Sequence, residues 1–388
     1  MKILHVVSSL NQNAGGISEV VPRICEEMSA IGEDVHIVTC RSRYYSDATA
    51  RAMSHGVRIT FAELNQCRFG LAFSWDFKRR IEEAVAWADV VHINGLWQAP
   101  GWIAARTARK LGIPYVVQPH GFLEPERLKV SSLKKRIAAM LFERKCINNS
   151  AAVIATSESE QTGIQSFGIN RPVFVVPIGI DISPVDAASR NDGLLTRMGL
   201  NPAKRTVLYF SRITPIKGLD LLAEAWASLA DLHRDWQLLI AGPDDRGYSR
   251  EIERLYDKLV GDQSYVICGP VYGDDKYALL KSVDAFVLPT RSENFSISVL
   301  EALAAGLPTV CTKGAPWEII EREGAGAWID VLPAAIAAGL RKIMTAGHGE
   351  SAEMSAAGRR IVSSHFQWPV IARRQVEIYR NVLSGAMQ

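Results

Sequence analysis

Two glutamates stand seven residues apart in the stretch PTRSENFSISVLEALAAGLPTV at 289–310. Between Glu293 and Glu301 the residues are mostly small or apolar, and the pattern predicts a helix that starts near Ser296. An acid among apolar residues needs a partner, because burying an unpaired carboxylate is costly. The N–H groups at the start of such a helix can bind an anion. The alternative is a capped core helix, in which Glu293 simply favours the helix dipole and Glu301 is a surface residue.

Two cations follow a predicted buried strand at 206–212. Arg212 and Lys217 are five residues apart, across a turn that ends in Gly218, and an amphipathic helix follows. Cations at the carboxyl end of a buried strand are costly unless something anionic pairs with them. A bidentate guanidinium and a point-charge ammonium together suit a diphosphate. The alternative is a turn whose two cations are simply solvated.

A pair of glycines, Gly15 and Gly16, lies where the first predicted strand turns into a helix. Their backbone N–H groups could approach an anion at the helix N-terminus. The alternative is a plain glycine turn, since the pattern is neither GxGxxG nor a Walker loop. Neither predicted domain begins with the dinucleotide fingerprint, which disfavours a nicotinamide oxidoreductase.

Short apolar runs alternate with helical stretches along the chain, which predicts an α/β protein with parallel strands joined by crossover helices. We expect two doubly wound, Rossmann-like domains that face a central cleft, because open sheets bind ligands at the carboxyl ends of their strands. The first domain spans 1–183 and the second 184–365, with the interdomain linker within 183–205. Residues 366–388 form a closing helix that could pack back on the N-terminal domain. The predicted strands lie at 2–8, 34–39, 89–94, 115–120, 151–157, 173–180, 206–212, 236–242, 264–269, 284–290 and 308–312.

The composition is that of an ordinary soluble globular protein, with 388 residues, 48% hydrophobic and 22% charged residues. A net charge of +3 is too small to indicate nucleic acid as a partner. The six cysteines form no CxxC pair, so we expect a reduced, cytoplasmic protein without structural zinc. The N-terminus is predicted to be a strand and not a signal peptide. No apolar run approaches the roughly 20 residues of a spanning helix, so any membrane contact is expected to be peripheral.

Taken together, the motifs resemble those of glycosyltransferase family 4, retaining sugar-nucleotide enzymes with the GT-B fold, and the similarity covers essentially the whole chain. Two departures bear on the donor sugar. Ser211 stands where the family often has glycine, and Glu293-Asn294-Phe295-Ser296 stands where it often has Glu-Gly-Phe-Gly. Glu293 and Glu301 match the family's double-glutamate motif, and Arg212 and Lys217 match its phosphate-binding cations. Gly15 and Gly16 match its N-terminal glycine loop, and His120 matches its histidine after the fourth strand.

The resemblance implies a role for each matched residue. Glu301 should hydrogen-bond the ribose of the nucleotide, while Glu293 and His120, facing across the cleft, should contact the donor sugar. The two cations should stabilise the leaving diphosphate. Catalytic roles fall to His120, Glu293, Arg212 and Lys217. The donor-binding residues implied are Gly15, Gly16, Arg212, Lys217, Val271 near the base, Asn294, Phe295, Ser296, Ile297, Ser298 and Glu301.

The resemblance also implies substrates. The donor is a UDP- or GDP-linked sugar, used without metal or other cofactor, and the acceptor is a glycan or a polyprenyl-diphosphate-linked sugar. The pathway implied is exopolysaccharide, capsule or lipopolysaccharide synthesis. Two alternatives stay open, namely a sugar-nucleotide epimerase of the same architecture and a non-catalytic nucleotide-sugar-binding protein.

A basic amphipathic stretch at 127–146 follows His120. It could bind an anionic membrane surface on the inner face of the cell membrane, through Lys134, Lys135 and Arg136. Alternatively, its apolar face packs on the domain and its basic face is solvated. Nearby, Trp97 and Trp102 could stack on a sugar acceptor, although we expect packing roles for both.

Overall fold

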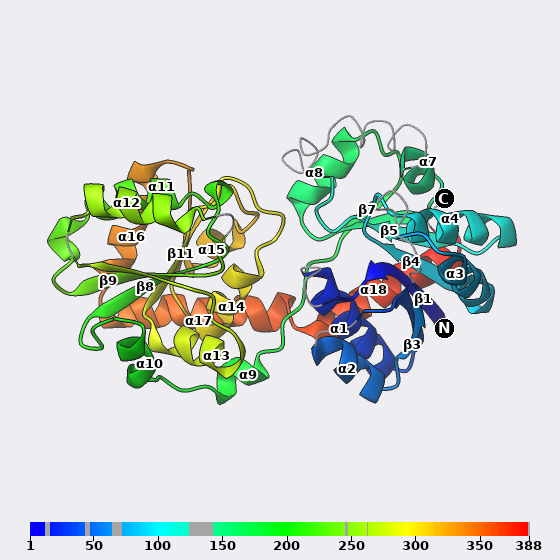
Figure 1. Cartoon of the computed structure of the whole chain (residues 1–388), viewed down its shortest axis with the longest axis horizontal. Coiled ribbons are helices and arrows are strands. Elements are labelled where there is room, and N and C mark those ends of the chain that lie inside the picture. Colours follow the sequence, from blue (N-terminus) through cyan, green and yellow to red (C-terminus); the bar gives the residue numbers. More distant parts are fainter. Residues whose placement is uncertain are drawn as a thin grey trace. The chain divides into compact units, whose positions relative to one another are not determined.

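The computed structural model describes residues 1–11, 16–42, 47–63, 72–123, 143–244, 247–261 and 263–386. The chain divides into two compact units (Figure 1). The first unit combines Met1–Gly179 with Trp368–Gln388, and the second is Ile180–Gln367. The chain thus enters the second unit at Ile180 and leaves it at Gln367.

The first unit contains a parallel sheet whose strands are in the order β3-β2-β1-β4-β5-β6-β7. The order reverses between β1 and β4, so the carboxyl ends of these two strands form the switch point at which open α/β sheets bind ligands. The strands are β1 (Lys2–Ser9), β2 (Asp34–Cys40), β3 (Arg58–Ala62), β4 (Val90–Asn94), β5 (Tyr115–Gln118), β6 (Ala152–Ala155) and β7 (Val173–Val175).

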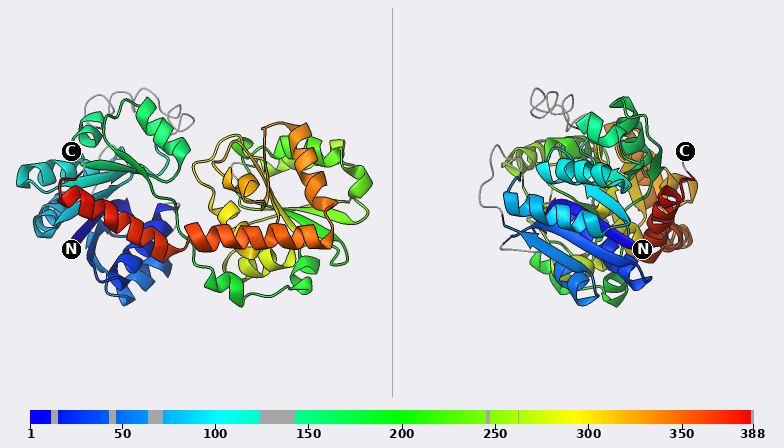
Figure 2. Two further views of the ribbon diagram at one scale, coloured as in Figure 1. Left: turned by 180° about the vertical axis from the view of Figure 1, so that it is seen from behind. Right: turned by 90° about the vertical axis from the view of Figure 1, so that its right-hand side faces the viewer.

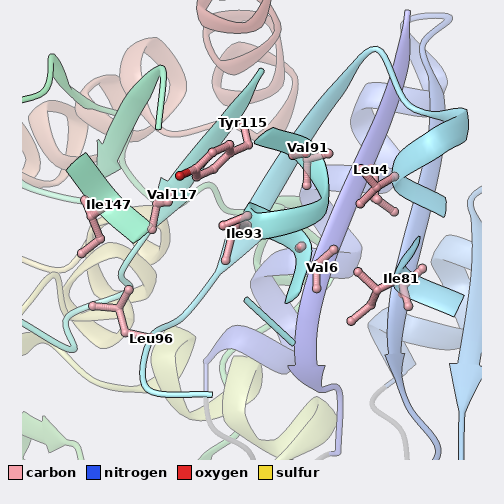
Figure 3. Packing of buried hydrophobic residues seen from close by; sticks show 14 of the residues in the cluster. Leu4, Val6, Ile81, Val91, Ile93, Leu96, Tyr115, Val117 and Ile147 are labelled. Atoms are coloured by element: carbon pink, nitrogen blue, oxygen red, sulfur yellow. The ribbon is translucent and has the colours of Figure 1, made fainter. Parts of the chain in front are cut away.

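Apolar side chains on both faces of this sheet explain why its strands are continuous hydrophobic runs. Alternate residues of a strand point to opposite faces. Leu4 and Val6 of β1 therefore join the cluster on one face, which includes Ile81 (Figure 3), while Ile3 and Val7 join the cluster on the other face. The helices of this unit are α1 (Ile17–Ala30), α2 (Asp47–Ser54), α3 (Trp75–Trp87), α4 (Ala99–Leu111), α7 (Arg144–Asn148), α8 (Glu158–Ser166) and α18 (Trp368–Leu383).

Helix α18 lies beside α1 on the first unit (Figure 2). Its buried side includes Trp368, Ile371 and Tyr379. Two apolar residues of this helix are exposed, Val370 by 37% and Leu383 by 42%. Val370 lies on the side opposite the buried stripe, and Leu383 is the last residue of the helix. None of the helices in the described part of the chain is long and apolar enough to cross a membrane.

The second unit contains a second parallel sheet, in the order β10-β9-β8-β11-β12-β13, with its switch point between β8 and β11. Helices α11, α12 and α16 cover one face, and α13, α14 and α17 cover the other (Figure 1). The elements are α9 (Ser183–Ala187), α10 (Asp192–Arg197), β8 (Arg205–Phe210), η4 (Pro215–Lys217), α11 (Leu219–Ala227), η5 (Ala230–Leu232), β9 (Trp236–Ala241), α12 (Ser249–Leu259), β10 (Tyr265–Cys268), α13 (Gly273–Ser282), β11 (Ala285–Leu288), α14 (Ile297–Ala305), β12 (Thr309–Thr312), α15 (Ile319–Arg322), β13 (Gly326–Ile329), α16 (Pro333–Met344) and α17 (His348–His365).

Residues 183–205 do not form the linker that the sequence predicts. They contain α9 and α10 and belong to the second unit. Asn191 caps α10 by accepting a 2.9 Å hydrogen bond from the Leu194 N–H, and Leu194 and Leu195 are buried. The polar turns around α9 and α10 give this segment the composition of a linker, although both helices pack within the second unit.

Candidate functional site

The backbone that carries Arg212 is fixed at the carboxyl end of β8. The Tyr209 hydroxyl donates a 2.7 Å hydrogen bond to the Arg212 carbonyl. A Cβ at Gly242 would lie 1.9 Å from the Ser211 carbonyl oxygen, so only glycine lets the segment after β9 approach this closely. The Arg212 side chain itself is exposed. A guanidinium on a rigid backbone at a switch point is well placed to bind an anion.

The turn that carries Lys217 is joined to the segment after β11. Gly218 has φ +71°, and a Cβ there would lie 2.1 Å from the Pro289 carbonyl oxygen. The Ile216 carbonyl accepts hydrogen bonds from the Arg291 N–H at 2.8 Å and the Thr290 hydroxyl at 3.2 Å. The carboxyl ends of the two switch-point strands are therefore bound to each other through backbone contacts.

This junction brings Lys217 and Glu293 into direct contact as an ion pair. The Lys217 side chain is 6% exposed and the Glu293 side chain 20% exposed. Removing one partner of such a buried pair leaves the other charge uncompensated, which is strongly destabilising. The sequence predicted separate ligands for these two residues. In the structure each is the other's partner.

A second clamp at the same junction was not predicted. Arg291 binds both carboxylate oxygens of Asp220, at 2.8 and 2.6 Å, and also donates to the Pro215 carbonyl at 2.8 Å. Partial burial of Asp220 opposes its charge, but the hydrogen bonds and the charge of Arg291 outweigh this effect and lower the pKa of Asp220. The two partners are far apart in the sequence, and neither has a local pattern that would reveal the pair.

Helix α14 begins after Ser296, as the sequence predicted, and no side chain of the described residues caps it. Ser296 has φ +69° and ψ +92°, a backbone conformation that is uncommon and strained for a residue other than glycine. Its hydroxyl lies 3.1 Å from that of Ser298. The first N–H groups of α14, around Ile297 and Ser298, are therefore available to a ligand or to water.

An aromatic cluster holds the loop before α14. Phe295 is buried, and its ring centroid lies 5.1 Å from that of Trp317 and 5.9 Å from that of Phe366. The Trp317 indole also donates a hydrogen bond to the Phe295 carbonyl. This anchoring fixes the loop that contains Glu293 and Asn294 relative to the helix start, and it explains why an apolar residue stands within a polar motif.

Glu301 has the partner that its apolar surroundings required. Lys276 of α13 binds the Glu301 carboxylate at 2.8 Å, with 22% and 13% of the two side chains exposed. Burial works against the charge on Lys276, but the carboxylate and its hydrogen bond outweigh that effect and raise the pKa of Lys276. Val271, predicted near the base, is buried just before α13. The sequence stretch GPVYGDDK thus supplies both Val271 and the unpredicted Lys276.

His120 follows β5 in the first unit. It has φ +55° and is followed by Gly121 with φ +78°, so the chain makes a sharp turn here. The buried Glu160 carboxylate accepts a hydrogen bond from the Gly121 N–H and two more, both 2.7 Å, from Thr156. The His120 ring lies 3.1 Å from the Asn94 side-chain oxygen, and burial lowers the pKa of His120 to about 3. The imidazole is therefore neutral at physiological pH.

The predicted glycine loop is described only in part. Gly16 is the exposed N-cap of α1, and its carbonyl accepts a 2.9 Å hydrogen bond from the Val20 N–H. Gly15 lies outside the described residues. So does most of the basic stretch 127–146, of which only the last four residues belong to the described part.

A buried acid lies near the carboxyl end of β4. One oxygen of Glu143 accepts hydrogen bonds from the Trp97 N–H at 2.5 Å and the Trp102 indole at 2.7 Å. Burial raises the pKa of Glu143 to about 7, although these hydrogen bonds work in the opposite direction. Trp97 also packs edge-on against Phe167, with ring centroids 6.1 Å apart. The two tryptophans thus make the packing contacts that the sequence favoured, and Glu143 was not predicted.

Known protein families divide the chain at nearly the same place as the structure does. The glycosyl transferase 4-like domain matches residues 15–179, and the glycosyl transferases group 1 domain matches residues 196–361. The chain belongs to the glycosyltransferases that combine these two domains. The glycosyltransferase is 28% identical to the GDP-mannose:cellobiosyl-diphosphopolyprenol alpha-mannosyltransferase of Xanthomonas oryzae pv. oryzae, over 79% of this chain and 77% of the relative. It is 27% identical to the D-inositol 3-phosphate glycosyltransferase of Frankia alni, over 96% of both chains.

Solved structures confirm the predicted fold. Anabaena HepE in complex with UDP and glucose has a TM-score of 0.75 at 18% identity, covering 98% of this chain and 100% of HepE. Sucrose-phosphate synthase from Thermosynechococcus elongatus has a TM-score of 0.72 at 18% identity, covering 99% and 100%. The glycosyltransferase therefore has the GT-B fold, with two parallel-sheet, Rossmann-like domains.

Proposed function

We propose that this glycosyltransferase moves a sugar from a UDP- or GDP-linked donor to a glycan or lipid-linked acceptor, with retention of anomeric configuration. One observation carries the proposal. Two acid–cation pairs, Lys217 with Glu293 and Lys276 with Glu301, flank the uncapped start of α14 beside the switch point of the second unit. An uncapped helix start suits a diphosphate, and an acid on each side suits the hydroxyl groups of a ribose and of a sugar.

Each residue has a proposed task in the reaction. Arg212, Lys217 and the first N–H groups of α14 bind the diphosphate, for which Lys217 exchanges part of its contact with Glu293. Glu301 binds the ribose beside a base held near Val271, and Glu293 and His120 bind the donor sugar. These cations take the place of a metal ion in neutralising the diphosphate, so the proposed reaction is metal-independent.

The proposed chemistry is a front-face displacement. The bond between the anomeric carbon and the phosphate oxygen breaks, and the acceptor oxygen bonds to the same face of that carbon. The acceptor proton passes to the released diphosphate. Arg212 and the N–H groups of α14 stabilise the negative charge that develops on the leaving group, which is the dominant contribution in many such reactions.

A lipid-linked acceptor in bacterial polysaccharide synthesis is the acceptor we favour. The name of the Xanthomonas relative describes transfer to cellobiosyl-diphosphopolyprenol, which supports this choice. A cytoplasmic enzyme would meet such an acceptor at the inner face of the membrane, for which the basic stretch 127–146 offers cations. Reversing the charges of Lys134, Lys135 and Arg136 should abolish co-sedimentation with anionic liposomes, and unchanged co-sedimentation would exclude this contact.

The reaction itself is tested by incubating the protein with UDP- and GDP-hexoses that carry ¹³C at the anomeric carbon. We expect release of the nucleoside diphosphate, stimulated by a lipid-linked glycan and insensitive to EDTA, with a product in which NMR shows the donor's anomeric configuration. Inversion, or a requirement for metal, would contradict the mechanism. Conversion of the donor to a 2-epimer would identify an epimerase instead.

A further inference from the structure

Buried polar side chains form an unbroken chain from the C-terminal helix α18 to His120. Asn94, at the end of β4, contacts His120 at one end of its amide and His5 at the other, at 3.1 and 3.3 Å. His5 and His92 are cross-strand neighbours on β1 and β4, and their rings stack with centroids 4.6 Å apart. All but His120 are at least nine-tenths buried.

The backbone around Asn94 fixes the orientation of its amide. The Asn94 side-chain nitrogen lies 3.4 Å from both the Val6 and the His92 carbonyl oxygens. Carbonyl oxygens only accept hydrogen bonds, so the NH₂ group must be on their side. The Asn94 oxygen therefore faces His120, and because this oxygen also only accepts, the His120 Nε2 must carry the proton.

We propose that Asn94 is a positioning residue that holds His120 in the neutral tautomer protonated at Nε2. The Nδ1 atom of His120 is then an acceptor, and it has no hydrogen-bond partner among the described residues. An acceptor nitrogen at this position suits a sugar hydroxyl group, which donates to it. This step rests on the proposed function, in which His120 contacts the donor sugar.

Two residues of α18 hold the His92 end of this row of polar side chains. His92 Nδ1 lies 2.5 Å from the Tyr379 hydroxyl and 2.9 Å from the Gln375 amide nitrogen, and that nitrogen also donates to Tyr379 at 2.6 Å. Both residues belong to α18. The Nε2 atoms of His5 and His92 have no hydrogen-bond partner among the described residues, so α18 fixes the His92 ring through its Nδ1 atom, and ring stacking passes this constraint to His5. Helix α18 thus helps to determine which ring nitrogen of His120 carries the proton.

Histidine ring ¹⁵N spectra test the assignment without any substrate. In the wild-type protein at pH 7, the His120 signals, identified by their loss in His120→Gln, should show a neutral ring protonated at Nε2. Asn94→Leu, which removes the acceptor, should raise the Nδ1–H form to a comparable population. Asn94→Gln, which keeps an amide with both its acceptor oxygen and its NH₂ group, should retain the Nε2–H form. As a control, Asn148→Leu on α7 removes a hydrogen-bonding asparagine elsewhere in this unit and should leave the His120 signals unchanged.

Kinetics then separate positioning from a purely structural role. Asn94→Leu should lower kcat/KM for the donor by about tenfold while the Kd of the free nucleoside diphosphate, bound by the second unit, changes less than twofold. Asn94→Gln should restore much of the rate. A wild-type His120 protonated at Nδ1, or an Asn94→Leu spectrum identical to wild type, would overturn the proposal. If the protein uses no nucleotide sugar, the proposed function is wrong. The tautomer assignment is tested separately, by the ¹⁵N spectra alone.

Discussion

At the scale of single residues, the second unit satisfies its buried charges in pairs. Lys276 holds Glu301 and Lys217 holds Glu293, so the acids expected to bind hydroxyl groups are already oriented before any ligand arrives. Such preorganisation lowers the cost of ordering the site on binding. The pairs also make these residues interdependent, because removing one charge leaves its partner unpaired.

The ribose role of Glu301 predicts a large loss of affinity in Glu301→Ala. We expect the Kd for the preferred nucleoside diphosphate to rise about ten- to a hundredfold, since hydrogen bonds to a charged group contribute about 1.5–3 kcal/mol. Calorimetric titration measures this directly. The matched control is Glu224→Ala, which removes an exposed acid of α11 in the same unit. Equal affinity of the Glu301 and Glu224 variants would remove the ribose role.

The buried Glu143 predicts an unusual dependence of stability on pH. Its pKa is about 7 in the folded protein and lies near 4.5 in the unfolded chain, so the folded state holds a proton that the unfolded state releases. Stability should therefore fall as pH rises from about 4.5 to 7. Relative to Glu143→Gln, the wild type should lose about 3 kcal/mol across this window.

Urea denaturation of both proteins at pH 5 and pH 8 measures this difference, and contributions from other titrating groups cancel in the comparison. Glu158→Gln, at an exposed position at the start of α8, is the control and should track the wild type at both pH values. If the free energies of unfolding of the wild type and Glu143→Gln differ by the same amount at pH 5 and at pH 8, Glu143 does not titrate as described.

At the scale of elements, the site depends on two strand ends joined by backbone contacts. Gly218 is the tightest point of this junction, because a Cβ there would meet the Pro289 carbonyl oxygen at 2.1 Å. Gly324 has a similar φ of +76° in the same unit, but a Cβ there would meet nothing within 4 Å. The two glycines therefore separate the cost of the backbone conformation from the cost of breaking the junction.

We expect Gly324→Ala to lower the free energy of unfolding by about 1–2 kcal/mol, the cost of a left-handed conformation alone. Gly218→Ala should lower it by more and should also weaken nucleotide binding, since it displaces Lys217. Denaturant titration and calorimetry measure the two effects. If both variants lose the same stability and keep the same affinity, the junction is not what places Lys217.

The sequence contained enough to predict the central strands, because buried parallel strands are continuous apolar runs. It did not reveal β3 or β13. Both are outermost strands of their sheets, short and less uniformly apolar, so neither shows the pattern of a central strand. In the site, the need of Glu301 for a partner was predictable from its apolar neighbours. That the partner is Lys276 was not, because packing of α13 against α14 decides it.

At the scale of the whole molecule, the chain is a glycosyltransferase with the GT-B fold, and the residues proposed to bind the nucleotide belong to one unit. Arg212, Lys217, Glu293, Lys276 and Glu301 all lie within Ile180–Gln367. Donor binding can therefore be measured on the full chain without knowledge of the acceptor. This property makes binding a more direct test than transfer, which requires both substrates.

Thermal unfolding of the full chain with UDP, GDP and their sugars detects donor binding without any acceptor. A ligand at 100 times its Kd should stabilise the protein by about 2.7 kcal/mol. We predict this shift for one nucleotide class, its reduction in Arg212→Ala, and its persistence in Arg250→Ala, which removes an exposed arginine of α12. No shift with any of these nucleotides at millimolar concentration would contradict the assignment of the donor site.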